Sequence, residues 1–144
     1  MLVHQILQSK HSSDVFTIPP ETPVSKAAET MSQMKIGALV VSSDGQVPLG
    51  ILSERDIVRE LGKRGPACME DRVEQMMTSK LVTCTRAETT DGVLTKMTDG
   101  RFRHMPVMDG EMMVGLISIG DVVKARLSEL SMEKEALEGM IMGH

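Results

Sequence analysis

One stretch of this chain occurs twice, and the repetition constrains the fold more than any other feature. Residues 50–58 read Gly-Ile-Leu-Ser-Glu-Arg-Asp-Ile-Val, and residues 115–123 read Gly-Leu-Ile-Ser-Ile-Gly-Asp-Val-Val. Three residue types return at one spacing of 65 positions: Gly50 and Gly115, Ser53 and Ser118, and Asp56 and Asp121. A fixed period within a chain indicates a repeated structural unit. Two copies predict a pseudo-symmetric pair rather than a solenoid.

Hydrophobic patterning predicts the same order of elements, β-α-β-β-α, in each copy. In the first copy we expect strands at 15–18, 38–41 and 49–52, a helix with Thr22 as N-cap and Pro23 as its first residue, and a second helix from Ser53 to Leu61, closed by Gly62. In the second copy we expect strands at 81–84, 105–108 and 112–117, with helices at 91–100 and from Ser118. The predicted fold class is α/β (α+β), with two such repeats related by a pseudo-two-fold axis.

The repeats also predict how the chain divides. We assign residues 1–64 to the first repeat with its lead-in, 65–128 to a linker and the second repeat, and 129–144 to a C-terminal helical tail. Gly65-Pro66 is expected to break any helix in the linker, which spans 62–76. Apolar residues continue along the tail nearly in a/d register, interrupted by Lys134: Val123, Leu127, Leu130, Leu137 and Ile141. This pattern favours a tail that folds back or joins a dimer partner.

Composition narrows the class of protein. The 144 residues are 41 % hydrophobic and 25 % charged, which is ordinary for a globular protein. The net charge is −4 and the chain has just two aromatic residues, and both facts argue against nucleic-acid binding. The one local feature that favours nucleic-acid binding is the set of basic residues Lys63, Arg64 and Arg72. The sequence has neither an apolar run of about 20 residues nor a basic-flanked leader, so we expect no membrane insertion and a cytoplasmic location.

The sequence offers poor candidates for catalysis. It contains no GxSxG, GxxxxGK[ST] or HExxH motif, and no paired catalytic carboxylates. His4, His11 and His144 are scattered, and Cys68 and Cys84 have no CxxC partner, so neither a metal site nor a disulfide framework is expected. We therefore expect a non-catalytic protein.

The repeated Ser-x-x-Asp has two compatible interpretations. Ser followed three residues later by an acid forms a capping box, which satisfies free N–H groups at a helix start. Alternatively, a helix start after a glycine-containing strand is an anion site, and an aspartate one turn into the helix accepts ribose hydroxyls. The sequence alone leaves both interpretations open.

The order of these motifs resembles a tandem pair of cystathionine-β-synthase-type (CBS) domains, also called a Bateman module. The resemblance covers about residues 15–62 and 76–128, and it includes the stretches 15–19, 36–41, 74–78 and 101–107 besides the repeated motif. It implies repeats packed sheet to sheet, with two related clefts between them. It also implies ligands that contain adenosine: AMP, ADP, ATP, S-adenosylmethionine or NAD(H).

In that family each cleft takes residues from both repeats. One cleft would hold ribose on Asp56 and phosphate near Ser53 and Arg55, and would be lined by Lys80, Leu81, Val82, Phe102 and Arg103. The other would hold ribose on Asp121 beside Ser118, with the base between Val15, Phe16, Ile36, Gly37 and Ala38. Repeat two has Ile119-Gly120 in place of Glu54-Arg55 and so lacks a local cation. The phosphate charge would therefore be pooled from Arg55, Arg103 and His104, unless Arg55 pairs with Glu54, Asp56 or Glu60 on a solvated helix.

The resemblance predicts a regulatory module for energy sensing and signal transduction. A bound nucleotide, AMP or ATP before the others, would shift the conformation and so alter an unidentified partner protein. The family also suggests a homodimer formed through helices, for which we expect the apolar positions Ala27, Met31, Met34, Val93 and Met97. The alternative is a ligand-free adaptor that acts through the helical surfaces of a chain with 14 methionines.

Overall fold

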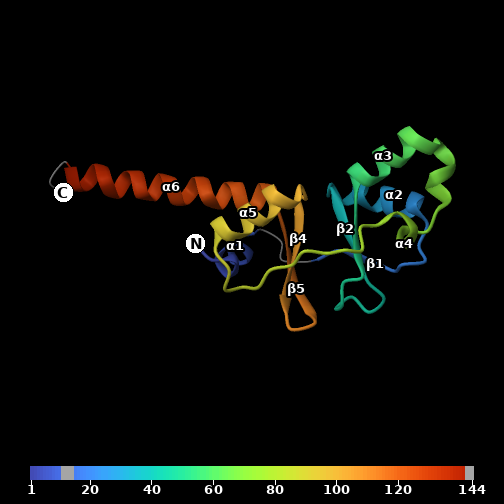
Figure 1. Cartoon of the computed structure of the whole chain (residues 1–144), viewed down its shortest axis with the longest axis horizontal. Coiled ribbons are helices and arrows are strands. Elements are labelled where there is room, and N and C mark those ends of the chain that lie inside the picture. Colours follow the sequence, from blue (N-terminus) through green and yellow to red (C-terminus); the bar gives the residue numbers. More distant parts are fainter. Residues whose placement is uncertain (11–14, 142–144) are drawn as a thin grey trace. The chain divides into compact units, whose positions relative to one another are not determined.

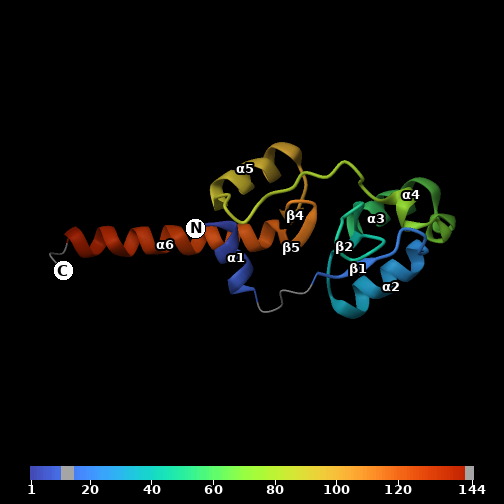
Figure 2. The same cartoon turned by 90° about the horizontal axis from the view of Figure 1, so that it is seen from below.

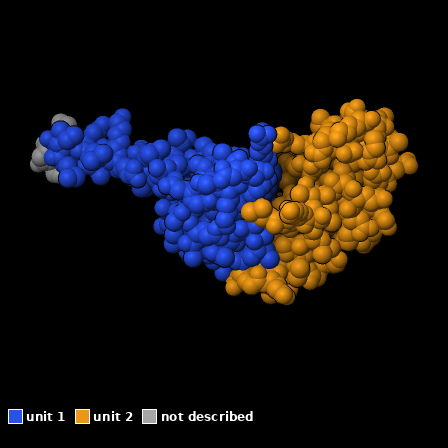
Figure 3. Space-filling model, in the orientation of Figure 1, with its two compact units in different colours: residues 1–13, 83–108, 115–144 blue, residues 14–82, 109–114 orange. Residues whose placement is uncertain are grey.

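The computed structural model describes residues 1–10 and 15–141. The chain divides into two compact units, coloured separately in Figure 3, and each is described by itself. Unit 1 comprises residues 1–13, 83–108 and 115–144, and unit 2 comprises residues 14–82 and 109–114. Helices and strands together form the mixed α+β fold that the repeats predict (Figure 1).

Unit 2 contains the first repeat, built on a three-stranded sheet. Its strands are β1 (Thr17–Ile18), β2 (Ala38–Val41) and β3 (Gly50–Ser53); β1 runs parallel to β2, and β2 runs antiparallel to β3. All four residues of β2 are buried, as its continuous apolar run predicts. Helices α2 (Val24–Met34) and α3 (Glu54–Arg64) share one core cluster with Leu39 and Leu52 of the sheet. They therefore pack on one face of it.

The start of α2 differs from the prediction by one residue. Pro23, not Thr22, is the N-cap, and its backbone is extended with ψ at 144°. The Val24 N–H donates to the Asp71 carbonyl oxygen at 2.8 Å, and the Val73 N–H donates to the Thr22 carbonyl oxygen at 2.8 Å. The loop before α4 thus supplies the partner that a capping side chain would supply.

The predicted linker is largely helical, and the expected helix end at Gly62 is wrong. Helix α3 continues to Arg64, and Gly65, with φ at +76°, then allows the chain to turn. A 3₁₀ helix, η1 (Pro66–Glu70), and a short helix, α4 (Val73–Met76), follow. Cys68 and Val73 are buried in the core of unit 2, and this burial outweighs the helix-breaking signal of the linker sequence.

Unit 1 contains most of the second repeat. Helix α5 (Thr90–Gly100) precedes the hairpin of β4 (His104–Asp109) and β5 (Met112–Ser118), and α6 (Ile119–Ile141) follows without a break. The tip of the hairpin, residues 109–114, belongs to unit 2, where the Met113 N–H donates to the Gln46 carbonyl oxygen at 2.8 Å. The strand expected at 81–84 is reduced to one parallel bridge between Cys84 and Val107.

The N-terminal lead-in forms a helix, α1 (Val3–Ser9), and lies in unit 1 rather than with the first repeat (Figure 2). Val3 and Ile6 are buried, and the Val3 N–H donates to the Glu88 carbonyl oxygen at 2.9 Å. Thr90 N–H and Oγ1 both donate to the Met1 carbonyl oxygen. The lead-in therefore completes the core of the second repeat.

The apolar stripe that we expected to form a homodimer interface is mostly core. Ala27 and Met31 of α2 are buried within unit 2, and Val93 and Met97 of α5 are buried within unit 1. Met34, at 45 % exposed, is the one residue of that set left on the surface. The stripe is explained by packing of each helix on its own unit, so the expected interface is wrong at these four positions.

Candidate functional site

The first repeated motif forms a capping box where β3 meets α3. The Asp56 N–H donates to Ser53 Oγ at 3.2 Å, and the Ser53 N–H donates to Asp56 Oδ2 at 2.9 Å. The glycine before it permits a close approach, because a Cβ on Gly50 would lie 2.9 Å from the Thr78 carbonyl oxygen. Asp56 itself is buried, with 6 % of its surface exposed. The capping interpretation is therefore confirmed for this copy.

The second motif forms the same box where β5 meets α6. The Asp121 N–H donates to Ser118 Oγ at 3.1 Å, and the Ser118 N–H donates to Asp121 Oδ2 at 2.9 Å. Ser118 and Asp121 are half-buried. Each repeat thus holds an aspartate carboxylate at the start of a helix. The strand before that helix contains the repeated glycine, Gly50 in β3 and Gly115 in β5.

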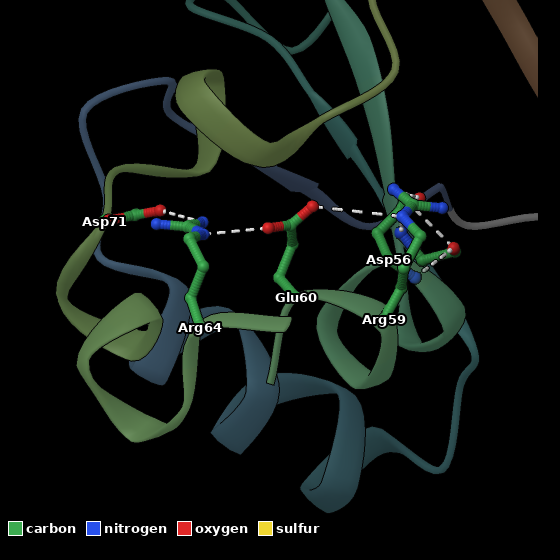
Figure 4. A network of polar contacts seen from close by, with 6 residues as sticks. Asp56, Arg59, Glu60, Arg64 and Asp71 are labelled. Carbon is green, nitrogen blue, oxygen red and sulfur yellow. Dashed lines mark hydrogen bonds and ion pairs between the residues drawn. The ribbon is translucent and has the colours of Figure 1, made fainter. Parts of the chain in front are cut away.

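The two aspartates have different counterions. Arg59 Nη2 lies 3.0 Å from Asp56 Oδ1, and from Arg59 a chain of ion pairs continues along α3 through Glu60 and Arg64 to Asp71 (Figure 4). Arg55 has no ion-pair partner among the described residues, so the expected alternative of a pair with a neighbouring acid on α3 is not seen. Arg55 is exposed.

Lys10 supplies the counterion of the second box. Its Nζ lies 3.0 Å from Asp121 Oδ2 and donates to the Leu116 carbonyl oxygen at 2.8 Å. Burial raises the pKa of Asp121, but the hydrogen bond from Ser118 and the charge of Lys10 outweigh that effect and lower the pKa below its ordinary value. The sequence did not predict the contact of Lys10 with the second box. Lys10 lies in the lead-in, and no sequence motif indicates a contact between residues more than a hundred positions apart.

Each box has a backbone neighbour at the same position of its own repeat. The Glu54 N–H donates to the Gly37 carbonyl oxygen at 2.9 Å, and the Ile119 N–H donates to the Arg103 carbonyl oxygen at 2.8 Å. Unit 2 therefore brings Ile36, Gly37 and Ala38 beside the first box, and unit 1 brings Phe102, Arg103 and His104 beside the second. Arg103 is exposed and His104 is half-buried.

The remaining predicted residues lie in unit 2. Val15, Phe16 and Leu81 are half-buried, and Lys80 and Val82 are exposed. The Phe16 carbonyl oxygen accepts from the Val40 N–H at 3.2 Å, which fixes it beside the sheet. The crosswise combination of residues into clefts joins both units, and it stays a prediction.

Unit 2 also has a hollow that sequence reasoning did not anticipate, between α2 and α3 with a volume of about 530 Å³. It is lined by Ala28, Met31, Ser32, Lys35, Ile36, Gly37, Glu54, Ile57 and Val58. Its walls are mainly apolar, with Lys35 and Glu54 as its two charged groups. Two of the residues predicted to contact the base, Ile36 and Gly37, thus also border this hollow.

Other reactive groups of the described residues are buried or dispersed. Cys68 and Cys84 are free and buried, and burial raises the pKa of Cys84 to about 12, so its thiol stays protonated. Within residues 1–10 and 15–141, no three His, Cys, Asp or Glu side chains are grouped to hold a metal ion. No helix in that part of the chain has the length and apolarity needed to cross a membrane.

Comparison with known proteins places these features in one family. The CBS-domain family matches residues 4–63 and 73–128. The CBS domain-containing protein CBSX3, mitochondrial, of Arabidopsis thaliana is 38 % identical over 121 residues, which are 81 % of this chain and 59 % of that protein. The chain thus spans less than two thirds of the length of this curated relative.

Solved structures agree with this placement. The CBS-domain containing protein ATU1752 from Agrobacterium tumefaciens is 43 % identical with a TM-score of 0.83, covering 88 % of this chain and 99 % of that one. The CBS domain pair of protein MJ0100, solved with 5′-methylthioadenosine and S-adenosyl-L-methionine, has a TM-score of 0.77 and 23 % identity, covering 90 % and 98 % of the two chains. With two matched domains joined by one short segment, this chain belongs to the CBS-domain family as a tandem pair.

Proposed function

We propose that this chain is a regulatory module that binds an adenosine nucleotide and signals to a partner protein by a change in conformation. The observation that carries the proposal is the duplicated box, which fixes an aspartate carboxylate in the first turn of α3 and of α6. Carboxylate oxygens accept from ribose hydroxyls, and helix N-termini favour phosphate. AMP and ATP are the first candidates, with ADP, NAD(H) and S-adenosylmethionine next.

Two further points support the choice of ligand. The MJ0100 pair, of the same fold, was solved with two adenosine compounds. The cations near the boxes also suit a phosphate: Arg55 and Arg103 are exposed and lack ion-pair partners among the described residues, so a ligand displaces no existing pair at either. Crosswise clefts that unite Asp56 with Arg103, and Asp121 with Phe16 and Ala38, remain part of the proposal.

The mechanism that we propose is a population shift. A nucleotide that contacts both repeats favours the arrangement of units in which its contacts are complete, and this preference changes the affinity for the partner. A coupling free energy of about 1–3 kcal/mol is sufficient. The proposal needs no catalytic step, and it includes self-association as a homodimer. It also places the module in the cytoplasm, although the Arabidopsis relative carries a mitochondrial name.

Calorimetric titration of the full chain with AMP, ATP, NADH and S-adenosylmethionine tests this function. Asp56→Asn and Asp121→Asn each keep an acceptor for the serine N–H and remove the charge, so each is expected to abolish one site and leave the fold intact. Asp91→Asn is the matched control, because Asp91 lies in the first turn of α5, outside both boxes, and its side chain is 66 % exposed.

The titration also separates the adaptor alternative. Met132 and Met140 of α6 are 61 % and 77 % exposed, which favours docking of a partner on that helix if the boxes serve only as caps. Binding of none of the four compounds, or equal binding by wild type and both Asn variants, would refute the nucleotide proposal. The boxes would then be structural, and the adaptor function would lead.

A further inference from the structure

Helix α6 carries an apolar seam that its own unit leaves uncovered. The seam consists of Val123, Leu127, Leu130, Lys134, Leu137 and Ile141, spaced alternately by four and three residues. Its five apolar side chains are exposed in order by 42, 62, 44, 59 and 84 %. This alternation of four and three residues is a seven-residue repeat. It keeps a stripe on one side of a helix over its whole length, and it is typical of a two-stranded coiled coil.

Unit 1 uses a different face of α6. Val122 and Ala125 are buried there, and Arg126 forms ion pairs with Asp91 and Glu129 at 3.1 and 3.2 Å. At 3.6 residues per turn, this face lies roughly 100° around the helix from the seam. Packing on α1 and α5 therefore leaves the seam open, and the last turns of α6 extend past both helices (Figure 2).

We propose that the seam of α6 pairs with the same seam of a second copy of this chain, with the two helices antiparallel. The pairing holds with or without a bound nucleotide, so it stands apart from the ligand proposal. An antiparallel register centred between Leu130 and Lys134 brings every seam position opposite another one. Val123 meets Ile141 of the second copy, Leu127 meets Leu137, and Leu130 meets Lys134.

Position 134 selects this direction over the parallel one. In a parallel pair of equal register, Lys134 faces Lys134 of the second copy in the seam, and Glu133 faces Glu138 at its edge. Like charges in those places oppose association. The antiparallel pair instead lays the Lys134 stem on Leu130 of the second copy, and its ammonium stays in water. The Lys134 side chain is 76 % exposed in the single chain.

The charges of α6 also favour the antiparallel direction. Residues 119–128 contain Asp121, Lys124 and Arg126, a net charge of +1, whereas residues 129–141 contain four glutamates and Lys134, a net charge of −3. Antiparallel pairing places each basic half beside an acidic half, with Lys124 opposite Glu138 at the edge of the seam in two places. Glu133 faces Glu133 of the second copy once, against two Glu133–Glu138 pairs in the parallel direction. Antiparallel pairing also brings cations near the acidic C-terminal turns, whose own helix dipole is unfavourable for glutamate.

Cysteine cross-linking of the full chain tests both pairing and direction. The variants Leu127→Cys and Leu137→Cys carry different tags. A short bis-maleimide is added to each variant alone and, in a separate reaction, to a mixture of the two. We expect the mixed pair to cross-link and each variant alone to remain uncross-linked. Cross-linking of Leu127→Cys with itself would overturn the antiparallel direction, and failure of every combination would overturn pairing with a second copy. Wild type is the blank, because Cys68 and Cys84 are each 1 % exposed.

A substitution pair gives an independent readout by sedimentation. Leu127→Glu puts a charge opposite Leu137 of the second copy and is expected to weaken self-association at least about tenfold, since a leucine side chain is lost from each copy's contact. Met132→Glu is the control on the same helix, because Met132 is 61 % exposed and lies outside the seam. Equal weakening by both variants, or by neither, would contradict the proposed seam.

Discussion

At the scale of single residues, the two boxes share their hydrogen bonds and differ in their cations. Asp56 is tied to Arg59, which lies on its own helix, whereas Asp121 is tied to Lys10 from the lead-in. The sequence indicated inequality, because Ile119-Gly120 replaces Glu54-Arg55, but it suggested that the second box has no local cation. Lys10 fills that role. A ribose that binds Asp121 has to share the carboxylate with Lys10 or displace it.

Replacing Lys10 by Met tests the contribution of this pair to stability. The pKa of Asp121 is lowered below 3.8, so its ionised form stabilises the folded state above about pH 4, and this stability is lost as the pH falls through the lowered value. Lys10→Met is therefore expected to cost about 0.5–1 kcal/mol of unfolding free energy at pH 7 and progressively less as the pH falls below about 4. Urea denaturation at pH 7 and pH 3 measures the difference.

Lys26→Met serves as the control for this experiment, because Lys26 forms only an exposed pair with Glu29 at 3.7 Å. We expect that variant to match wild type at both pH values. An unchanged cost for Lys10→Met at pH 3 would show that Lys10 acts through its packing or through Leu116 rather than through the carboxylate of Asp121.

At the scale of elements, the sequence predicted what local patterns determine. The structure contains the buried strand at 38–41, the helix starts at Ser53 and Ser118 and the long last helix. At these places the hydrophobic period, the capping residues and the local composition all favour the same element. The linker was predicted poorly, since Cys68 and Val73 become helical by burial in the core of unit 2 and not by propensity. Contacts between distant segments, such as Lys10 with Asp121, have no local signal at all.

Helix α1 is the element whose role changed most between sequence and structure. Val3 is completely buried in unit 1, so Val3→Ala is expected to lower the unfolding free energy by about 1–2 kcal/mol through the cavity that it leaves. Val58→Ala on α3 is the control, because Val58 is 67 % exposed and its truncation removes little packing. Guanidinium denaturation of both variants measures the effect. Equal stability of the two would mean that α1 is not part of the core.

At the scale of the whole molecule, the duplicated box raises the question of whether one ligand engages both units. Each box is complete within its own unit, since Ser53 and Asp56 belong to unit 2 and Ser118 and Asp121 to unit 1. The hydrogen bonds of each box therefore lie within a single unit. The crosswise proposal adds that a nucleotide held by one aspartate also contacts residues of the other repeat, and this contact is what makes the pair a switch rather than two independent sites.

Hydrogen exchange with and without saturating AMP or ATP distinguishes these cases. A ligand that contacts both units slows exchange at residues 53–56 or 118–121 and also at the stretch of the other repeat that the crosswise proposal assigns to the same cleft, 102–104 or 36–38. Ligand at 100 times its dissociation constant adds about 2.7 kcal/mol to the stability of the bound state, so protection should rise by up to about a hundredfold at these amides. Asp56→Asn and Asp121→Asn should each remove one such pair of protected stretches. Protection confined to one unit would show that the ligand is held by a single repeat, and the coupling between repeats would then have to arise elsewhere in the chain.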